Sequence, residues 1–331
     1  MIRSILTAAA TATASLAAAD DQPVLTVYTY DSFVSDWGPG PQIETRFEER
    51  CACDLRFVAA GDGAALLARL KLEGSRSAAD IVLGLDTNLV AEAAATGLFA
   101  PHGVSAAFDL PIAWEDPVFL PYDWGYFAFV YDTARLAQAP DSFEALLAAP
   151  ADLRIIVQDP RSSTPGLGLL MWVKAVYGDR APEIWAALAP RILTVTKGWS
   201  EAYGMFLDGE AEMVLSYTTS PSYHRIAEND DTKRAAIFSE GHMMQIEVAG
   251  KLASSRQPDL ADAFLTFMRS AAFQSVIPTT NWMYPAVMPQ TGLPEGFDAP
   301  LGPDAALTIP AADAPALKAE ALAEWLAALS N

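Results

Sequence analysis

Basic side chains are scarce in this sequence. Its 331 residues include 21 lysines and arginines against 41 aspartates and glutamates, so the formal net charge is −20 at pH 7. Nucleic acids and anionic membranes carry the same sign of charge and are poor partners for such a chain. Long apolar runs are also lacking: 52% of the residues are hydrophobic, yet no run reaches the roughly eighteen residues of a membrane span. The composition therefore argues against nucleic-acid binding and against direct membrane insertion.

Cysteine and histidine are equally rare. Neither a Gly-x-Ser-x-Gly nor a His-Glu-x-x-His motif occurs, and none of the three histidines lies in a catalytic motif. The two cysteines, Cys51 and Cys53, are separated by one alanine. A disulfide between them would close almost no loop, and two cysteines alone make a poor zinc site. The sequence therefore predicts no enzyme, metal or cofactor, and it leaves the redox state of the pair open.

The first nineteen residues are predicted to be a cleavable export signal. Arg3 is the only charge before Asp20, and the stretch between them is short and apolar. It ends in the small residues 17–19, which suit signal peptidase. We therefore expect cleavage before Asp20 and a mature chain in the periplasm.

The rest of the chain alternates between predicted strands and helices. In the first part, strands are expected at 24–30, 55–59 and 79–84, and helices at 42–50, after Asp62 and at 88–96. The alternation returns with strands at 154–158, 193–196 and 213–217 and helices at 167–177 and 200–207. This order predicts mainly parallel sheets flanked by helices.

Two extended segments are predicted to connect these two parts. Residues 121–131 form a long aromatic and apolar run, and residues 243–249 form a second one. Two α/β lobes joined by such crossover strands are the simplest architecture, with predicted helices at 258–269 and 316–329 after them. We expect lobe 1 to comprise residues 20–125 and 248–331, and lobe 2 residues 126–247.

Binding features are richer than catalytic ones. The segment DPRSSTPGLG, residues 159–168, runs from a strand into the start of a helix. Its hydroxyls and free backbone N–H groups suit an anion, although an ordinary helix cap explains them equally well. Aromatic residues gather at predicted strand ends and in the loops that follow them, where open α/β sheets bind ligands. A flat aromatic or cationic ligand would use such rings by stacking and cation–π attraction.

Several phrases of the sequence resemble one family. VYTYDSFVSDWGPGP, GDGAALLARLKLEG, ADIVLGLD, YFAFVYD, QDPRSSTPGLGLL, TVTKGWSEAYG, VLSYTTSPSYH and IPTTNWMYP occur in this order between residues 24 and 286. Together they resemble the periplasmic thiamine-binding proteins of bacteria, the receptors of thiamine ABC importers. The segment from Val287 to Asn331 carries no recognisable motif.

The resemblance implies a type II periplasmic-binding-protein fold that holds thiamine, or its mono- and pyrophosphate, between two lobes and delivers it to a membrane permease. Carried over by position, it implies ligand contacts for Tyr30, Asp62, Gly63, Ser163, Thr164, Trp199, Tyr217, Thr218, Thr219, Ser220, Tyr223 and Trp282.

These residues suit the chemistry of thiamine, an aminopyrimidine joined to a cationic thiazolium with a hydroxyethyl arm. The aromatic members are expected to pack against the two rings, with Trp37 as a further candidate. Asp62 would accept a hydrogen bond from the pyrimidine amino group or oppose the positive charge. Ser163 and Thr164 would hold the hydroxyl or a phosphate.

Two alternatives stay open from the sequence. The same clamshell could bind another cation, either ferric iron, which needs a cluster of Tyr, His and acidic ligands, or a polyamine, which needs several carboxylates in the cleft. An exported enzyme that degrades a thiamine-like compound is the other alternative, and the lack of a cysteine in a catalytic motif argues against it.

Overall fold

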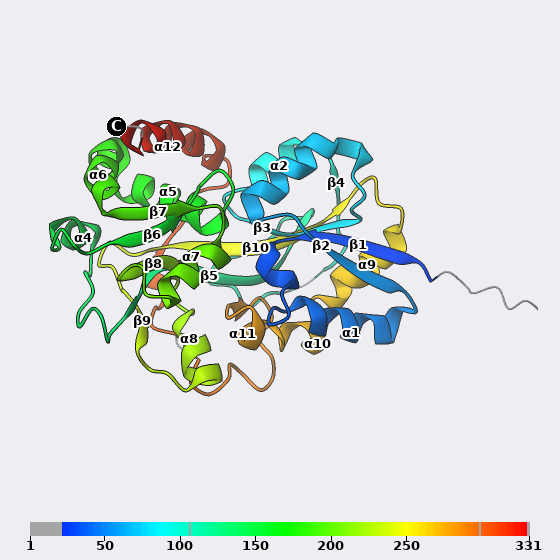
Figure 1. Ribbon diagram of the computed structural model, residues 1–331. Coiled ribbons are helices and arrows are strands. Elements are labelled where there is room, and N and C mark those ends of the chain that lie inside the picture. Colours follow the sequence, from blue (N-terminus) through cyan, green and yellow to red (C-terminus); the bar gives the residue numbers. More distant parts are fainter. Residues whose placement is uncertain (1–21, 106, 298, 330–331) are drawn as a thin grey trace, which may run out of the picture.

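The computed structural model describes residues 22–329 except residues 106 and 298, so the predicted export signal lies outside the described residues. Two groups of strands and helices lie side by side and share one continuous sheet (Figure 1). None of the helices in the described ranges has both the length and the apolar character of a membrane span.

Lobe 1 is built around three parallel strands rich in β-branched and aromatic residues, in the order β2-β1-β3. Helix α2 covers one face of these strands, and α1, α9 and α10 cover the other (Figure 1). The elements are β1 (Val24–Thr29), α1 (Gly40–Cys51), β2 (Asp54–Ala59), α2 (Gly63–Glu73), β3 (Ile81–Asp86), α3 (Val90–Ala95), β4 (Phe99–Ala100), α9 (Pro258–Phe267), α10 (Ala271–Gln274) and α11 (Ile277–Thr280).

Lobe 2 repeats this arrangement with three parallel strands in the order β8-β6-β7. Its core includes the fully buried Trp172 and Trp185 from the helices that cover the sheet. The elements are α4 (Phe143–Ala148), β6 (Ile155–Gln158), α5 (Thr164–Tyr177), α6 (Ala181–Leu188), β7 (Ile192–Thr196), α7 (Trp199–Leu207), β8 (Met213–Tyr217), α8 (Pro221–Tyr223) and β9 (Lys233–Ala235).

Two long strands, β5 (Phe119–Asp132) and β10 (His242–Leu252), connect the lobes and pair antiparallel with each other. Strand β10 also pairs with β3 of lobe 1, and β5 pairs with β8 of lobe 2. The predicted crossover strands and the predicted pair of α/β lobes are therefore confirmed. Two short strands, β11 (Tyr284–Pro285) and β12 (Ala306–Leu307), pair with β5 and β10.

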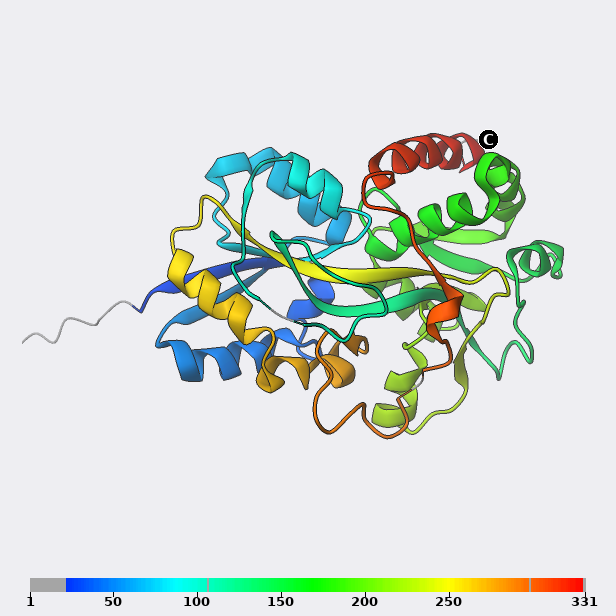
Figure 2. The same cartoon turned by 180° about the vertical axis from the view of Figure 1, so that it is seen from behind.

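The C-terminal helix α12 (Ala314–Leu329) packs on α5 and α6 (Figure 2). Its contacts include Lys174 of α5, whose side chain is 4% exposed and pairs with Glu320 at 2.8 Å and Glu324 at 2.7 Å. The boundaries of the predicted lobes stay a prediction, but this helix, which that prediction places with lobe 1, lies against lobe 2. A salt bridge of 2.7 Å between Lys318 and Glu92 of α3 also ties it to lobe 1.

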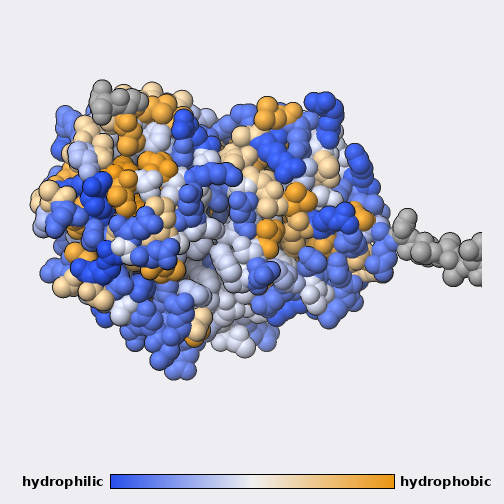
Figure 3. All heavy atoms as spheres, viewed as in Figure 1, coloured by the Kyte–Doolittle hydropathy of each residue, from blue (hydrophilic) through white to orange (hydrophobic). Residues whose placement is uncertain are grey.

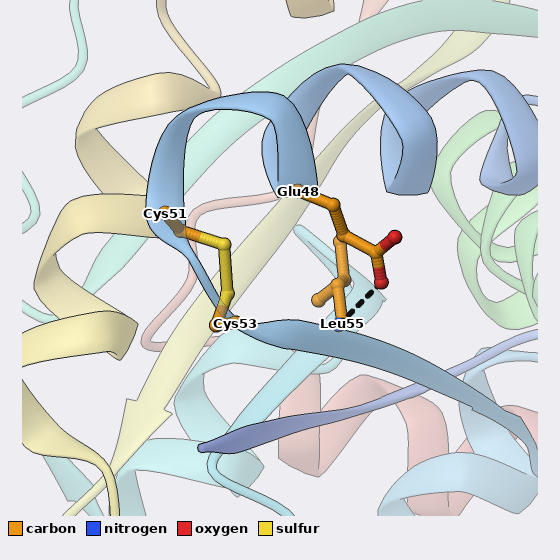
Figure 4. The surroundings of a disulfide bond; sticks show 4 residues. All are labelled: Glu48, Cys51, Cys53 and Leu55. Atoms are coloured by element: carbon orange, nitrogen blue, oxygen red, sulfur yellow. Dashed lines mark hydrogen bonds between the residues drawn. A yellow bond between two sulfur atoms is a disulfide. The ribbon is translucent and has the colours of Figure 1, made fainter. Parts of the chain in front are cut away.

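The two cysteines form a disulfide at the junction of α1 and β2 (Figure 4). Ala52 between them adopts a left-handed conformation with φ of 48°, which reverses the chain at the end of the helix. Beside the bond, Glu48 Oε1 accepts a hydrogen bond of 2.9 Å from the backbone N–H of Leu55. Both interactions hold the first helix to the second strand, far from the site described next.

Candidate functional site

A cavity of about 530 Å³ lies between the two lobes, at the carboxyl ends of β1 and β8. In the space-filling view, residues of intermediate hydropathy gather in the middle, along the boundary between the lobes (Figure 3). Open α/β sheets bind ligands at such strand ends. Trp37 and eight of the twelve residues that the resemblance implied line this cavity: Tyr30, Asp62, Thr164, Trp199, Tyr217, Ser220, Tyr223 and Trp282.

The other four named residues lie behind this lining. The backbone N–H of Gly63 donates to Thr164 Oγ1 at 3.2 Å, across the boundary between the lobes. Ser163, Thr218 and Thr219 are fully buried. That all twelve residues bind the ligand stays a prediction. The four residues behind the lining could act on the ligand only through the side chains in front of them, or could touch it only after the walls of the cavity rearrange.

Aromatic rings form the wall of the cavity on the side of lobe 2. Trp199 stacks on Tyr203 with ring centroids 5.0 Å apart, and Trp37 from lobe 1 approaches it at 6.2 Å. The indole N–H of Trp199 donates to Ser216 Oγ at 2.8 Å, which fixes the direction of the ring. Because its orientation is set by packing and a hydrogen bond, this surface is ready to stack against a flat ligand.

A second pair of rings, Tyr223 and Trp282, also lines the cavity. Tyr223 meets Trp282 edge to face at 5.4 Å. Trp282 has a φ of 55°, a conformation that bulky residues rarely adopt. Such strained positions occur where a functional site requires a particular side-chain direction. Trp282 lines the cavity from this position.

Asp62 directly connects the two lobes. It precedes α2 in lobe 1, but its Oδ2 accepts hydrogen bonds from Ser163 Oγ at 2.7 Å and from the backbone N–H of Trp199 at 3.0 Å. The start of α5, which the sequence suggested as an anion site or an ordinary helix cap, and the start of α7 thus face a carboxylate of the protein itself. Burial raises the pKa of Asp62 to about 6 against these hydrogen bonds.

Gly63 explains how the lobes come so close at this point. A Cβ on this residue would lie 2.5 Å from Thr164 Oγ1 and 2.8 Å from the carbonyl oxygen of Gly84. Both distances are far below van der Waals contact, so the residue has to be a glycine while the lobes are in this position.

The polar floor of the cavity was not predicted from the sequence: it consists of Gln245 and Glu247 on β10 and Asn281 after α11, with Asp123 on β5 directly behind them. A signal was present: Gln245 and Glu247 are two residues apart in an otherwise apolar predicted strand, so both side chains point to the same face. Their encounter with Asp123 and Asn281 depends on tertiary pairing that the sequence does not show.

Tyrosines and an amide bind the carboxylates of the floor. Glu247 Oε2 accepts hydrogen bonds from the hydroxyls of Tyr122 at 2.7 Å and Tyr30 at 3.0 Å. Asn281 Nδ2 donates to Asp123 Oδ2 at 2.6 Å. Burial raises the pKa of Glu247 to about 7. For Asp123, burial and the negative charge of the neighbouring Glu247 together raise the pKa well above its usual range.

His224, Glu228 and Asp230 form a group that could hold a metal ion. However, both ring nitrogens of His224 already have partners: Nδ1 lies 2.6 Å from Glu228 Oε2, and Nε2 lies 2.9 Å from the hydroxyl of Tyr203. Asp230 in turn pairs with Lys233 at 3.1 Å. The group is therefore a hydrogen-bonded support behind Tyr203 and Tyr223 rather than a metal centre.

Comparisons with known proteins agree with this geometry. Residues 39–275 match the family model described as bacterial extracellular solute-binding protein. The chain is 53% identical to the thiamine-binding periplasmic protein of Escherichia coli strain K12 over 94% of both chains. It is 51% identical to the protein of the same name from Brucella suis biovar 1, over 95% of this chain and 94% of the relative.

A solved structure described as a periplasmic thiamin binding protein superposes with a TM-score of 0.91 and 53% identity, covering 94% of this chain and 97% of that chain. The expected type II periplasmic-binding-protein fold is therefore confirmed. By its sequence and by its fold, the chain belongs to the bacterial extracellular solute-binding proteins and, among them, to the periplasmic thiamine-binding proteins.

Proposed function

We propose that this protein is a periplasmic receptor that binds thiamine between its lobes and delivers it to the membrane permease of an ABC transporter. The observation that carries the proposal is a cavity that combines stacking rings with buried carboxyl groups. Its relatives at about 50% identity are named as periplasmic binding proteins for this vitamin. The proposal involves no catalytic step and no cofactor.

Both parts of thiamine find suitable partners in the cavity. The two heteroaromatic rings can stack on Trp199, Tyr217 and Trp282, and each such contact is worth about 0.5–2 kcal/mol. The positive thiazolium needs a counter-charge, and Asp62 and Glu247 line the cavity without forming a salt bridge to any described residue. The same carboxyl groups disfavour a ligand that has no positive charge to place beside them.

Titration calorimetry and tryptophan fluorescence test the proposal directly. The protein is unfolded, dialysed and refolded to remove copurified ligand, and then titrated with thiamine, spermidine and ferric citrate in separate experiments. We expect saturable 1:1 binding of thiamine with a change in emission, because Trp37, Trp199 and Trp282 line the cavity. A flat thiamine titration would reject the proposal, and tighter binding of spermidine or iron would replace it with one of the cation alternatives.

We also propose that the receptor accepts thiamine monophosphate and pyrophosphate, with the phosphate at the starts of α5 and α7. The Ser163 hydroxyl and the Trp199 N–H already bind an anionic oxygen there, that of Asp62. A phosphate in this place would meet the Asp62 carboxylate, so its binding requires that Asp62 moves away or takes up a proton.

An Asp62→Asn variant tests this placement, because it removes the charge and keeps the size. The ratio of the affinities for thiamine monophosphate and thiamine should rise several-fold in the variant, and Glu183→Gln, which removes an exposed carboxyl outside the cavity, serves as control. An unchanged ratio would mean that the phosphate binds elsewhere. Failure of both proteins to bind either phosphate would reject the extension to phosphorylated forms and leave the thiamine proposal intact.

A further inference from the structure

Three carboxyl groups lie side by side across the middle of the sheet. In the strand register, Glu247 of β10 is opposite Asp86 of β3 on one side and opposite Asp123 of β5 on the other. Like charges on directly opposite residues destabilise a sheet, and all three side chains are buried. Full ionisation of this row without a counter-charge would therefore be very unfavourable.

The groups around the row supply hydrogen bonds but little positive charge. Tyr30 and Tyr122 donate to Glu247, and Asn281 donates to Asp123. Tyr217 faces the row from β8, and Asn88 donates to Asp86 at 2.9 Å. The cations that act on neighbouring acids are Lys318, on Asp86, and Lys197, on Asp62. Among the described residues, neither Asp123 nor Glu247 has a salt-bridge partner.

A second feature next to the row points to a missing ligand. Gln245 is fully buried, lines the cavity and has no partner for either its amide oxygen or its amide nitrogen. Asp123 Oδ1 has no protein donor either, but the side chains of Asp123 and Glu247 interact directly, as a proton held between the two carboxyl groups allows. Buried polar atoms nearly always form hydrogen bonds, so the amide of Gln245 awaits a partner that enters through the cavity. A polar heteroaromatic edge beside a positive charge would satisfy the amide and the acids together.

We propose that the Asp123–Glu247 pair retains a proton while the cavity is empty and releases it to the solvent when a cationic ligand binds beside Gln245. The proton leaves a carboxyl O–H group, the resulting carboxylate faces the cation, and the net charge of the closed site does not change. Uptake of the ligand is thus coupled to proton release. The inference rests on the proposed function, since it requires a ligand with a fixed positive charge.

The ionisation of Glu247 determines whether the affinity for the ligand rises or falls with pH. Its pKa of about 7 in the empty site falls when a cation lies next to it. Protonation then competes with the ligand at low pH, so affinity rises with pH and levels off once the acid is ionised. For one released proton and a pKa near 7, we expect about a tenfold gain in affinity between pH 6 and pH 8.

Titration calorimetry of the refolded, ligand-free protein with thiamine measures the released proton. At each pH the titration is repeated in buffers with different ionisation enthalpies, and the slope of observed enthalpy against buffer enthalpy gives the number of protons. We expect close to one proton at pH 6, about half a proton at pH 7 and almost none at pH 9. Glu247→Gln should remove the release at pH 7 and flatten the pH dependence above it, while Asp62, with a pKa of about 6, can add a release near pH 6 in both proteins.

Matched variants separate the possible outcomes. Glu183→Gln on α6 removes an exposed carboxyl far from the cavity and should behave like the unaltered protein. If Glu247→Gln does not fold, Asp123→Asn tests the same pair. Thiamine binding with a zero slope at pH 7 in the unaltered protein, or an undiminished slope at that pH in both pair variants, would overturn the coupling and leave the receptor function standing. Absence of any binding heat or fluorescence change would instead reject the receptor function.

Discussion

At the scale of single residues, the position of the aromatic rings was predictable and their polar neighbours were not. Tyr217 ends a strand and Trp199 comes shortly after one, so the sequence alone places them at the strand ends where α/β proteins bind ligands. Glu247 lies in the middle of a strand, and its partner Asp123 lies in another strand more than a hundred residues earlier. No local pattern predicts which strands will be neighbours, so the acidic row emerges only from the fold.

Tyr217 offers a clean test of stacking at this scale. Its ring rests on Phe127 with centroids 5.2 Å apart and faces the cavity. Tyr217→Ala should weaken thiamine binding by about 1–3 kcal/mol, because an aromatic contact surface is lost. Tyr217→Phe retains the ring and serves as the matched control, with a change well under that range. Calorimetry that finds equal affinities for the alanine variant and the unaltered protein would rule out a stacking role.

At the scale of secondary structure elements, most segments were predictable because their periodicity is strong. The predicted helix at 316–329 corresponds to α12, but its place in the molecule did not follow from its sequence. An apolar stripe on a helix fits any complementary surface, and only the packing on α5 and α6 shows which lobe it joins. The same limit applies to Lys174, which pairs with α12 in the folded protein although the sequence shows only an isolated lysine.

Lys174 is expected to fix α12 to lobe 2. Lys174→Met should lower the free energy of unfolding by about 2–3 kcal/mol, because it leaves the mostly buried Glu324 without a partner. Lys71→Met, which breaks an exposed salt bridge to Glu92, should cost less than about 1 kcal/mol. Urea denaturation of both variants measures the difference. Equal midpoints for the two would show that the buried pair contributes no more than a surface pair.

At the scale of the whole molecule, the net charge of −20 acts on any ligand before contact. A negative field raises the association rate of a cation, and salt screens that field over a Debye length of about 10 Å at 0.1 M. Stopped-flow fluorescence should therefore show that the association rate of thiamine falls several-fold between about 0.01 M and 1 M salt. The dissociation rate should change much less. An association rate independent of salt would mean that only local groups attract the ligand.

The β-bulge beside the acidic row has a mechanical consequence. The register between β5 and β10 shifts directly after Glu247, and the register between β10 and β3 shifts one residue later. Bulges bend a strand and increase its twist, and these strands are the ones that run through both lobes. Any change in the angle between the lobes therefore deforms the backbone that carries the counter-charge for the ligand. The few peptide units around Glu247 therefore influence both the affinity for the ligand and the way in which the two lobes open.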